Sequence, residues 1–143
     1  MMNMRQIVFC FLAVSLFFSC KPAEKSASLT GTKWVLESMN GREVKLKEPT
    51  SEVFMTLEDG KVNGKAGCNS FFGSYELGEG NQLDFGPMGA TKMACPDMDI
   101  EVFFFTMLDS TRIYTIEGNK LSLKDVNEGV LGVFKAEKEQ VDK

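Results

Sequence analysis

The residues that could carry chemistry in this chain are its cysteines, acids and glycines, because histidine is absent from all 143 residues. Without an imidazole, a Ser-His-Asp triad, a Cys-His pair and a histidine metal ligand are all excluded. Cys68 therefore has no imidazole that could activate it as a nucleophile. No serine has a lysine three residues later, so the Ser-x-x-Lys signature is missing too. We expect a protein that is not an enzyme.

Three acids in alternation, Asp97, Asp99 and Glu101, superficially resemble a metal cluster. A calcium loop would need a glycine and further oxygen ligands after the third acid, whereas three apolar residues follow it here. At alternate positions of a helix the side chains also diverge. The pattern favours capping and dipole stabilisation at a helix start over metal binding.

The glycines at positions 60, 64 and 67 have neither the spacing of a phosphate-binding loop nor that of a dinucleotide-binding loop. We therefore expect them to lie in hairpin turns and β-bulges. Met88, Met93 and Met98 flank Cys95 in the sequence, and thioether ligands suit Cu(I). Packing is the favoured reading of these methionines. We expect neither a metal nor a cofactor.

Composition is that of one globular domain, with 43% hydrophobic and 25% charged residues. The net charge is −4, from 16 basic and 20 acidic side chains, which argues against a nucleic-acid partner.

The N-terminus predicts export. Residues 1–19 read as a signal peptide, with Arg5 before an apolar run from Ile7 to Phe18. As a helix this run spans about 18 Å, too short for a bilayer core of ~30 Å. Cys20 follows the run after a small residue and resembles a bacterial lipobox; the alternative is an ordinary cleavage site beside an incidental cysteine.

Lipidation of Cys20 would make residues 20–28 a polar tether. We expect attachment to a membrane through this lipid alone. The expected location is the bacterial cell envelope, at the outer membrane, with the domain in the periplasm.

Strand and turn signals dominate the rest of the chain up to a polar tail at 137–143. The turn dipeptides Asn40-Gly41 and Asp59-Gly60 each follow a strand pattern. The expected strands are 32–37, a short one at Val44 and Leu46, 53–58, 61–64, 71–77, 82–85, 112–116, 120–124 and about 130–136.

One segment has helical periodicity and begins after Pro96 and Asp97. Its expected buried face consists of Ile100, Phe103, Phe104, Met107 and Leu108. Phe105 lies opposite Phe103, which suggests burial on more than one face. The fold class is therefore mainly β (α+β), a small antiparallel barrel-like or strongly curled sheet of about seven to eight strands with one covering helix.

Two stretches carry a specific resemblance to a known family. The stretch Gly67–Tyr75 (GCNSFFGSY) and the stretch Thr91–Pro96 (TKMACP), followed by Glu101 and Phe104, resemble the META domain. This family is typified by the heat-shock protein HslJ of the bacterial envelope. The resemblance covers about residues 29–136, including the opening GTKW and the later YTIEGNKL.

The resemblance to HslJ-like proteins implies a small barrel-like β fold with one helix, and many members are envelope lipoproteins associated with stress. It carries over no catalytic residue. We expect the matching positions to have structural roles. Gly67 and Gly73 suit bends of the chain, and the side chain of Asn69 can hydrogen-bond to its own backbone in a turn. The other matching positions are Cys68, Tyr75, Thr91, Met93, Ala94 and Cys95.

A disulfide between Cys68 and Cys95 is expected from the predicted export of the domain and from the number of cysteines that remain in it. Cys10 leaves with the signal peptide and Cys20 carries lipid, so two thiols remain in an exported domain. The alternative is a pair of buried thiols packed as small apolar side chains.

Two functions are consistent with these patterns. The first is a non-enzymatic envelope lipoprotein with an accessory role in envelope or heat stress, working with an envelope partner that the sequence does not identify. The alternative is a carrier that holds a small apolar ligand in a barrel-like cavity, which the chain's 12 phenylalanines could help to line. The sequence does not indicate an oligomeric state.

Overall fold

The computed structural model describes residues 25–47, 51–96 and 98–137. Within them the chain forms ten strands and one helix. In chain order they are β1 (Lys33–Met39), β2 (Arg42–Glu43), β3 (Glu52–Glu58), β4 (Lys61–Gly67), β5 (Ser70–Leu77), β6 (Leu83–Phe85), β7 (Gly89–Ala90), α1 (Met98–Ser110), β8 (Ile113–Glu117), β9 (Lys120–Lys124) and β10 (Val130–Ala136).

Eight of the strands form one antiparallel path in the order β6-β5-β4-β3-β1-β10-β9-β8, while β2 and β7 pair with β1 and β5 beside it. The two end strands of this path approach each other. The backbone N–H of Leu83 donates to the oxygen of Arg112 at 3.0 Å, and that of Tyr114 donates to the oxygen of Asn81 at 2.9 Å. The sheet is thus a nearly closed barrel, which confirms the predicted fold class.

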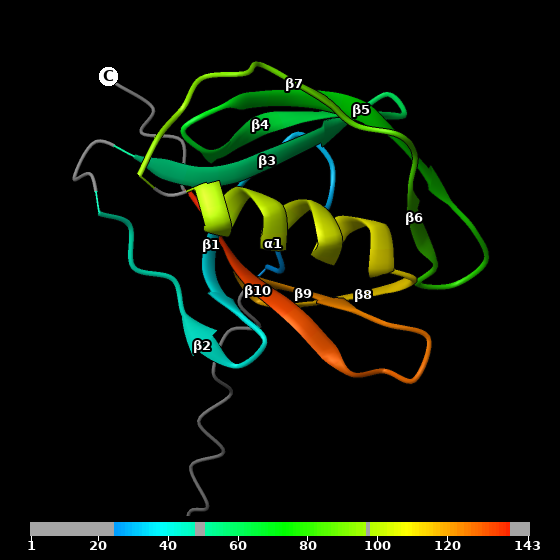
Figure 1. Ribbon diagram of the computed structural model, residues 1–143. Helices are drawn as coiled ribbons and strands as arrows, with labels where there is room; N and C mark the ends of the chain where they lie inside the picture. The colour runs from blue at the N-terminus through cyan, green and yellow to red at the C-terminus, as the bar shows by residue number, and fades with distance from the viewer. Residues whose placement is uncertain (1–24, 48–50, 97, 138–143) are drawn as a thin grey trace, which may run out of the picture.

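The two ends of the barrel are covered by different segments. Helix α1 lies across one opening, between the β3–β5 side and the β8–β10 side (Figure 1). At the other end, the segment 25–31 runs from the β8–β9 turn to the end of β3. There the N–H of Ala27 donates to Gly118 O at 2.8 Å, and that of Gly31 donates to Leu57 O at 2.9 Å.

Strand alternation places the core as the sequence predicts. Val53, Met55 and Leu57 of β3 are buried, while their neighbours face outward or are half-buried. Phe104 of α1 is fully buried, with its ring centroid 5.2 Å from that of Phe71 and 6.4 Å from that of Phe134. The space between sheet and helix is therefore filled by side chains.

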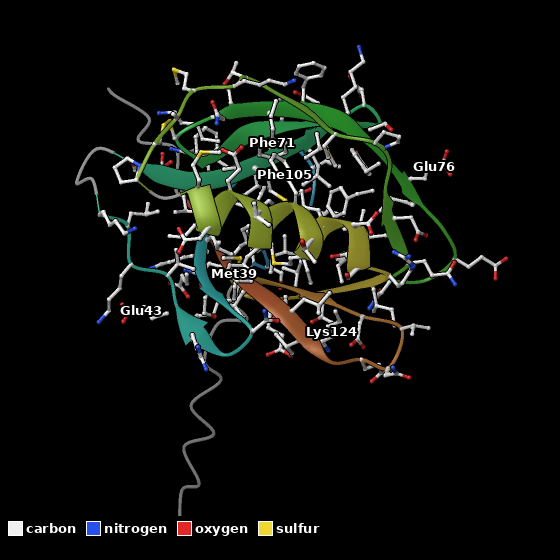
Figure 2. The ribbon with its side chains drawn as sticks, in the orientation of Figure 1. Met39, Glu43, Phe71, Glu76, Phe105 and Lys124 are labelled. Carbon is white, nitrogen blue, oxygen red and sulfur yellow. A yellow bond between two sulfur atoms is a disulfide. The ribbon has the colours of Figure 1, made fainter. Side chains whose placement is uncertain are left out.

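The helix departs from the predicted buried face most clearly at Phe103, while Ile100 is half-buried. Phe104, Met107 and Leu108 are buried as expected, but Phe103 is 58% exposed. Phe105 is half-buried and meets Phe71 edge-on, with 5.6 Å between the ring centroids. Figure 2 shows the two labelled residues close together between helix and sheet. Because Glu101 and Phe105 turn inward, the buried stripe is rotated away from Phe103.

The short strand that we expect at Val44 and Leu46 begins two residues earlier in the structure, where it is β2. Asn40 and Gly41 both have positive φ, 47° and 73°. A two-residue turn of this kind starts strand pairing at once, so Met39 pairs with Arg42. The sequence prediction also omitted β7, which pairs with β5 at Phe71 and Phe72.

Gly64 is a site of close backbone approach rather than a bulge. It lies in regular pairing between Met55 of β3 and Phe71 of β5. A Cβ atom there would overlap the backbone oxygen of Phe54 and lie 2.9 Å from the Cα of Met55. Only glycine fits this position without moving a neighbouring strand.

We therefore expect Gly64→Ala to lower the free energy of unfolding by about 2 kcal/mol, the usual scale for overpacking. Urea denaturation of the domain measures the change. Asn63→Ala, at the exposed neighbouring position on β4, is the matched control and should stay close to wild type. Equal stability of the two variants would contradict the close-approach explanation.

Within the described residues, no helix combines the length and apolar character needed to cross a bilayer.

Candidate functional site

Cys68 and Cys95 form a disulfide, with their Cα atoms 6.1 Å apart. Cys68 lies between β4 and β5, and Cys95 lies in the segment before α1. This confirms the predicted pairing. The bond attaches residues 91–96, which we call the strap, to the β4–β5 connection.

The side chain of Asn69, next to Cys68, is fully buried and holds the strap at several points. Its Oδ1 accepts hydrogen bonds from the hydroxyl of Thr91 and from the backbone N–H of Met93, each at 2.8 Å. Its Nδ2 donates to the backbone oxygen of Met93 at 3.1 Å and to Oε2 of Glu101 at 2.9 Å. Asn69 therefore joins three segments, and the expectation that it bonds its own backbone is wrong.

Glu101 is the least expected member of this cluster. Its side chain belongs to a residue only 8% exposed, on the same helical face as Phe104 and Leu108. The amide of Asn69 compensates part of the cost of burying a carboxylate. Its role is thus a buried hydrogen bond rather than only the dipole stabilisation predicted for it.

The two other acids of that pattern do not join the cluster. Asp99 is exposed in the first turn of α1, where it suits the helix dipole. Asp97 lies outside the described residues. No group of three or more cysteines or acids in the described part of the chain is arranged to hold a metal ion.

The predicted motif glycines have two different roles. Gly67 has a φ of +100°, a conformation that favours glycine at the end of β4. Gly73 does not adopt a positive φ; instead, the sulfur of Met88 and the backbone oxygen of Pro87 pack where its Cβ would be. The bend expected at Gly73 is therefore a close contact between β5 and the β6–β7 connection.

The remaining motif positions surround the same region. Tyr75 is buried in β5, whereas the side chain of Met93 is 55% exposed although its backbone is bonded to Asn69. Ala94 is exposed in the strap. The sulfur of Met98 lies 4.0 Å from Nδ2 of Asn69.

Chemically, this arrangement is a polar clamp, which we define as Asn69, Thr91, Met93 and Glu101. The neighbouring cysteines are oxidised, and all four hydrogen bonds that the Asn69 amide commonly makes are formed. Every buried side-chain nitrogen or oxygen in the described part of the chain has a partner.

The model of the META domain family matches residues 27–138, most of the chain. The chain belongs to the META domain family.

Two solved structures share the fold of this chain. An NMR structure of a protein from Burkholderia xenovorans is 26% identical to the chain, with a TM-score of 0.63 over 78% of this chain and 85% of that one. A second protein solved by NMR is 21% identical and shows the same fold, with a TM-score of 0.59 over 76% of this chain and 94% of that one. No protein of curated function matches the chain significantly.

The META domain has a surface groove between α1 and the β1–β2 hairpin, with a volume of about 600 Å³. Half-buried Met39, Val44 and Ile100 contribute apolar surface, and Phe103 extends it outward. Figure 2 shows Met39 close to the helix and Glu43 on the outer part of the hairpin. The full lining is Met39, Asn40, Arg42, Glu43, Val44, Lys45, Asp99, Ile100 and Phe103.

A cluster of charged side chains joins the beginning and the end of the META domain sequence through ion pairs. The ammonium of Lys33 on β1 lies 3.0 Å from Oε2 of Glu52 and 2.6 Å from Oε2 of Glu137, the first residue of the predicted polar tail. It also lies 4.5 Å from the ring centroid of Phe54. The hydrogen bond to Glu137, together with Glu52, holds the pKa of Lys33 above its usual range.

Proposed function

We propose that this META domain protein is a non-enzymatic envelope lipoprotein, anchored through an acylated Cys20 and acting in an accessory role under envelope or heat stress. The observation that carries the proposal is the Cys68–Cys95 disulfide. Stable disulfides belong to oxidising compartments outside the cytosol. The lipobox-like sequence at Cys20 supplies both the route of export and the anchor.

The absence of enzymatic activity is supported by how the motif residues are used. Oxidation blocks the two thiols, and the Asn69 amide is saturated with hydrogen bonds inside the fold. The chain also has no histidine that could supply a base near neutral pH. The motif of the META domain thus serves to build the β4–β5 connection and the strap.

A ligand-carrier function has less support. A carrier of this fold would hold its ligand between the sheet and the helix. In this structure Trp34, Phe104 and Phe134 are fully buried in that space and fill it. The groove beside α1 is a surface feature and does not enclose a ligand.

The anchor is tested by expressing the full chain in a bacterial host with a labelled fatty acid. We expect the wild type and Cys10→Ser to be acylated and recovered with membranes, because Cys10 lies inside the predicted signal peptide. Cys20→Ser should incorporate no label and should fail to restore heat or envelope-stress survival to a strain that lacks the gene. Acylation of Cys20→Ser would overturn the proposed anchor.

A further inference from the structure

The place where the chain leaves the barrel restricts how a lipid-anchored domain can lie on a membrane. Ala27 is held to the β8–β9 turn by the hydrogen bond from its N–H to Gly118 O, at 2.8 Å. Seven residue steps separate Ala27 from Cys20. A chain of that length spans at most about 24 Å when fully extended. The β8–β9 turn must therefore stay within that distance of the lipid.

The β1–β2 turn lies at the opposite end of the barrel. Lys33, at the start of β1, is close to the β8–β9 turn, because the neighbouring Trp34 pairs with Ala136 and the N–H of Ala136 donates to Asn119 O at 2.8 Å. From Lys33, β1 extends to Met39, about 20 Å further along at the usual strand rise. Asn40 begins the turn there and lines the groove with Phe103.

Two surfaces of the domain are therefore candidates for facing the anchoring membrane. One is the end that carries the β8–β9 turn, from which the tether leaves. The other is the exposed face of α1, where Val102 is 61% and Phe103 is 58% exposed. Exposed apolar side chains that adjoin one another are candidates for a membrane or protein contact. To insert them, the domain would have to invert and the tether would have to run back along the barrel.

We propose that the domain stands with its β8–β9 turn against the anchoring bilayer and with the β1–β2 turn and the exposed face of α1 directed away from it. Inversion would consume nearly the whole reach of the tether, about 20 of about 24 Å, and would remove its conformational freedom. The proposal rests on the proposed acylation of Cys20. It implies that Val102 and Phe103 do not enter the anchoring bilayer.

A matched pair of asparagines tests this orientation. Asn119 and Asn40 are both exposed, and both lie in two-residue hairpin turns with a glycine. Because Cys68 and Cys95 are paired and Cys20 is acylated in the proposed form, Asn119→Cys and Asn40→Cys each add one free thiol. Each purified, acylated protein is labelled with a fluorophore and bound to phosphatidylethanolamine–phosphatidylglycerol vesicles that carry an energy acceptor on some headgroups.

We expect energy transfer to the headgroups to be several-fold stronger from position 119 than from position 40. Equal transfer, or stronger transfer from position 40, would overturn the orientation while leaving the anchor intact. Intact-protein mass measured on the same samples reports acylation, and its absence would overturn the anchor and the orientation together. Glu117→Cys and Glu43→Cys, both exposed near the same two turns, give a second pair if labelling at an asparagine disturbs the fold.

Discussion

Replacing Asn69 with alanine should lower the free energy of unfolding by about 3 kcal/mol, a large share of the ~5–15 kcal/mol that stabilises a typical domain. The change removes four hydrogen bonds. It also leaves the buried carboxylate of Glu101 without the amide that solvates it. Water can partly replace the bonds to Thr91 and Met93, which lie in the exposed strap, so the loss is smaller than four fully buried bonds would give.

Urea denaturation measures this loss, and Asn119→Ala is the matched control because its side chain is exposed. The control should stay within about 0.5 kcal/mol of wild type. If Asn69→Ala were equally mild, the clamp would not contribute to stability.

In the same experiment, Asn69→Asp tests the effect of charge at this position while nearly keeping the shape of the side chain. The new carboxylate has nearly the shape of the amide, but it would stand where a donor now lies 2.9 Å from Glu101 Oε2. We expect a loss at least as large as that of alanine at neutral pH. A loss clearly smaller than that of Asn69→Ala would argue against direct contact of the two side chains.

Removal of the disulfide should cost a similar amount. For a loop with a sequence separation of 27, the chain-entropy model gives about 3.5 kcal/mol. The variant Cys68→Ala with Cys95→Ala should therefore unfold at a clearly lower urea concentration than wild type.

Reductant provides the internal control for this prediction. It should destabilise the wild type by about the same amount as the double substitution and leave the double variant unchanged. A wild type whose unfolding midpoint is insensitive to reductant would contradict a stabilising disulfide.

The disulfide and the hydrogen bonds of Asn69 hold the same strap, so the losses of unfolding free energy on removing each should not add. Cys68 and Asn69 are adjacent, and the partners of both lie in residues 91–96 or at the start of α1. Once the disulfide is lost, the strap is freer and the hydrogen bonds of Asn69 contribute less. We expect the triple variant to lose less stability than the sum of its parts, as coupled neighbours do.

Much of the fold could be predicted because its signals are local. Alternation over Val53, Met55 and Leu57 marks one face of a strand whatever the strand packs against. The pairs Asn40-Gly41 and Asp59-Gly60 specify tight turns through their own backbone preferences, and all four residues have positive φ. These short-range constraints were enough to predict a curled antiparallel sheet.

The candidate site could be predicted only in part. Cysteine count and compartment predicted the Cys68–Cys95 pair without any geometry. The partner of Asn69 was missed, because Glu101 lies 32 residues away and no local pattern joins them. One signal was available: Glu101, Phe104 and Leu108 have the 3–4 spacing of a single helical face, which places an acid among buried positions.

The sequence alone thus determined the longer strands, the hairpin turns, the existence of one amphipathic helix and the pairing of the cysteines, since each depends on neighbouring residues or on a count. It misplaced β2 and missed β7, because a two-residue strand exists only through the strand it pairs with. Tertiary structure decided which stripe of α1 is buried. Periodicity requires an apolar face, but the surface that the helix meets sets its rotation. Here the donor from Asn69 makes burial of Glu101 tolerable, and Phe103 stays exposed. Closure at the β6–β8 seam likewise depends on bringing together segments about 30 residues apart, which no local preference specifies.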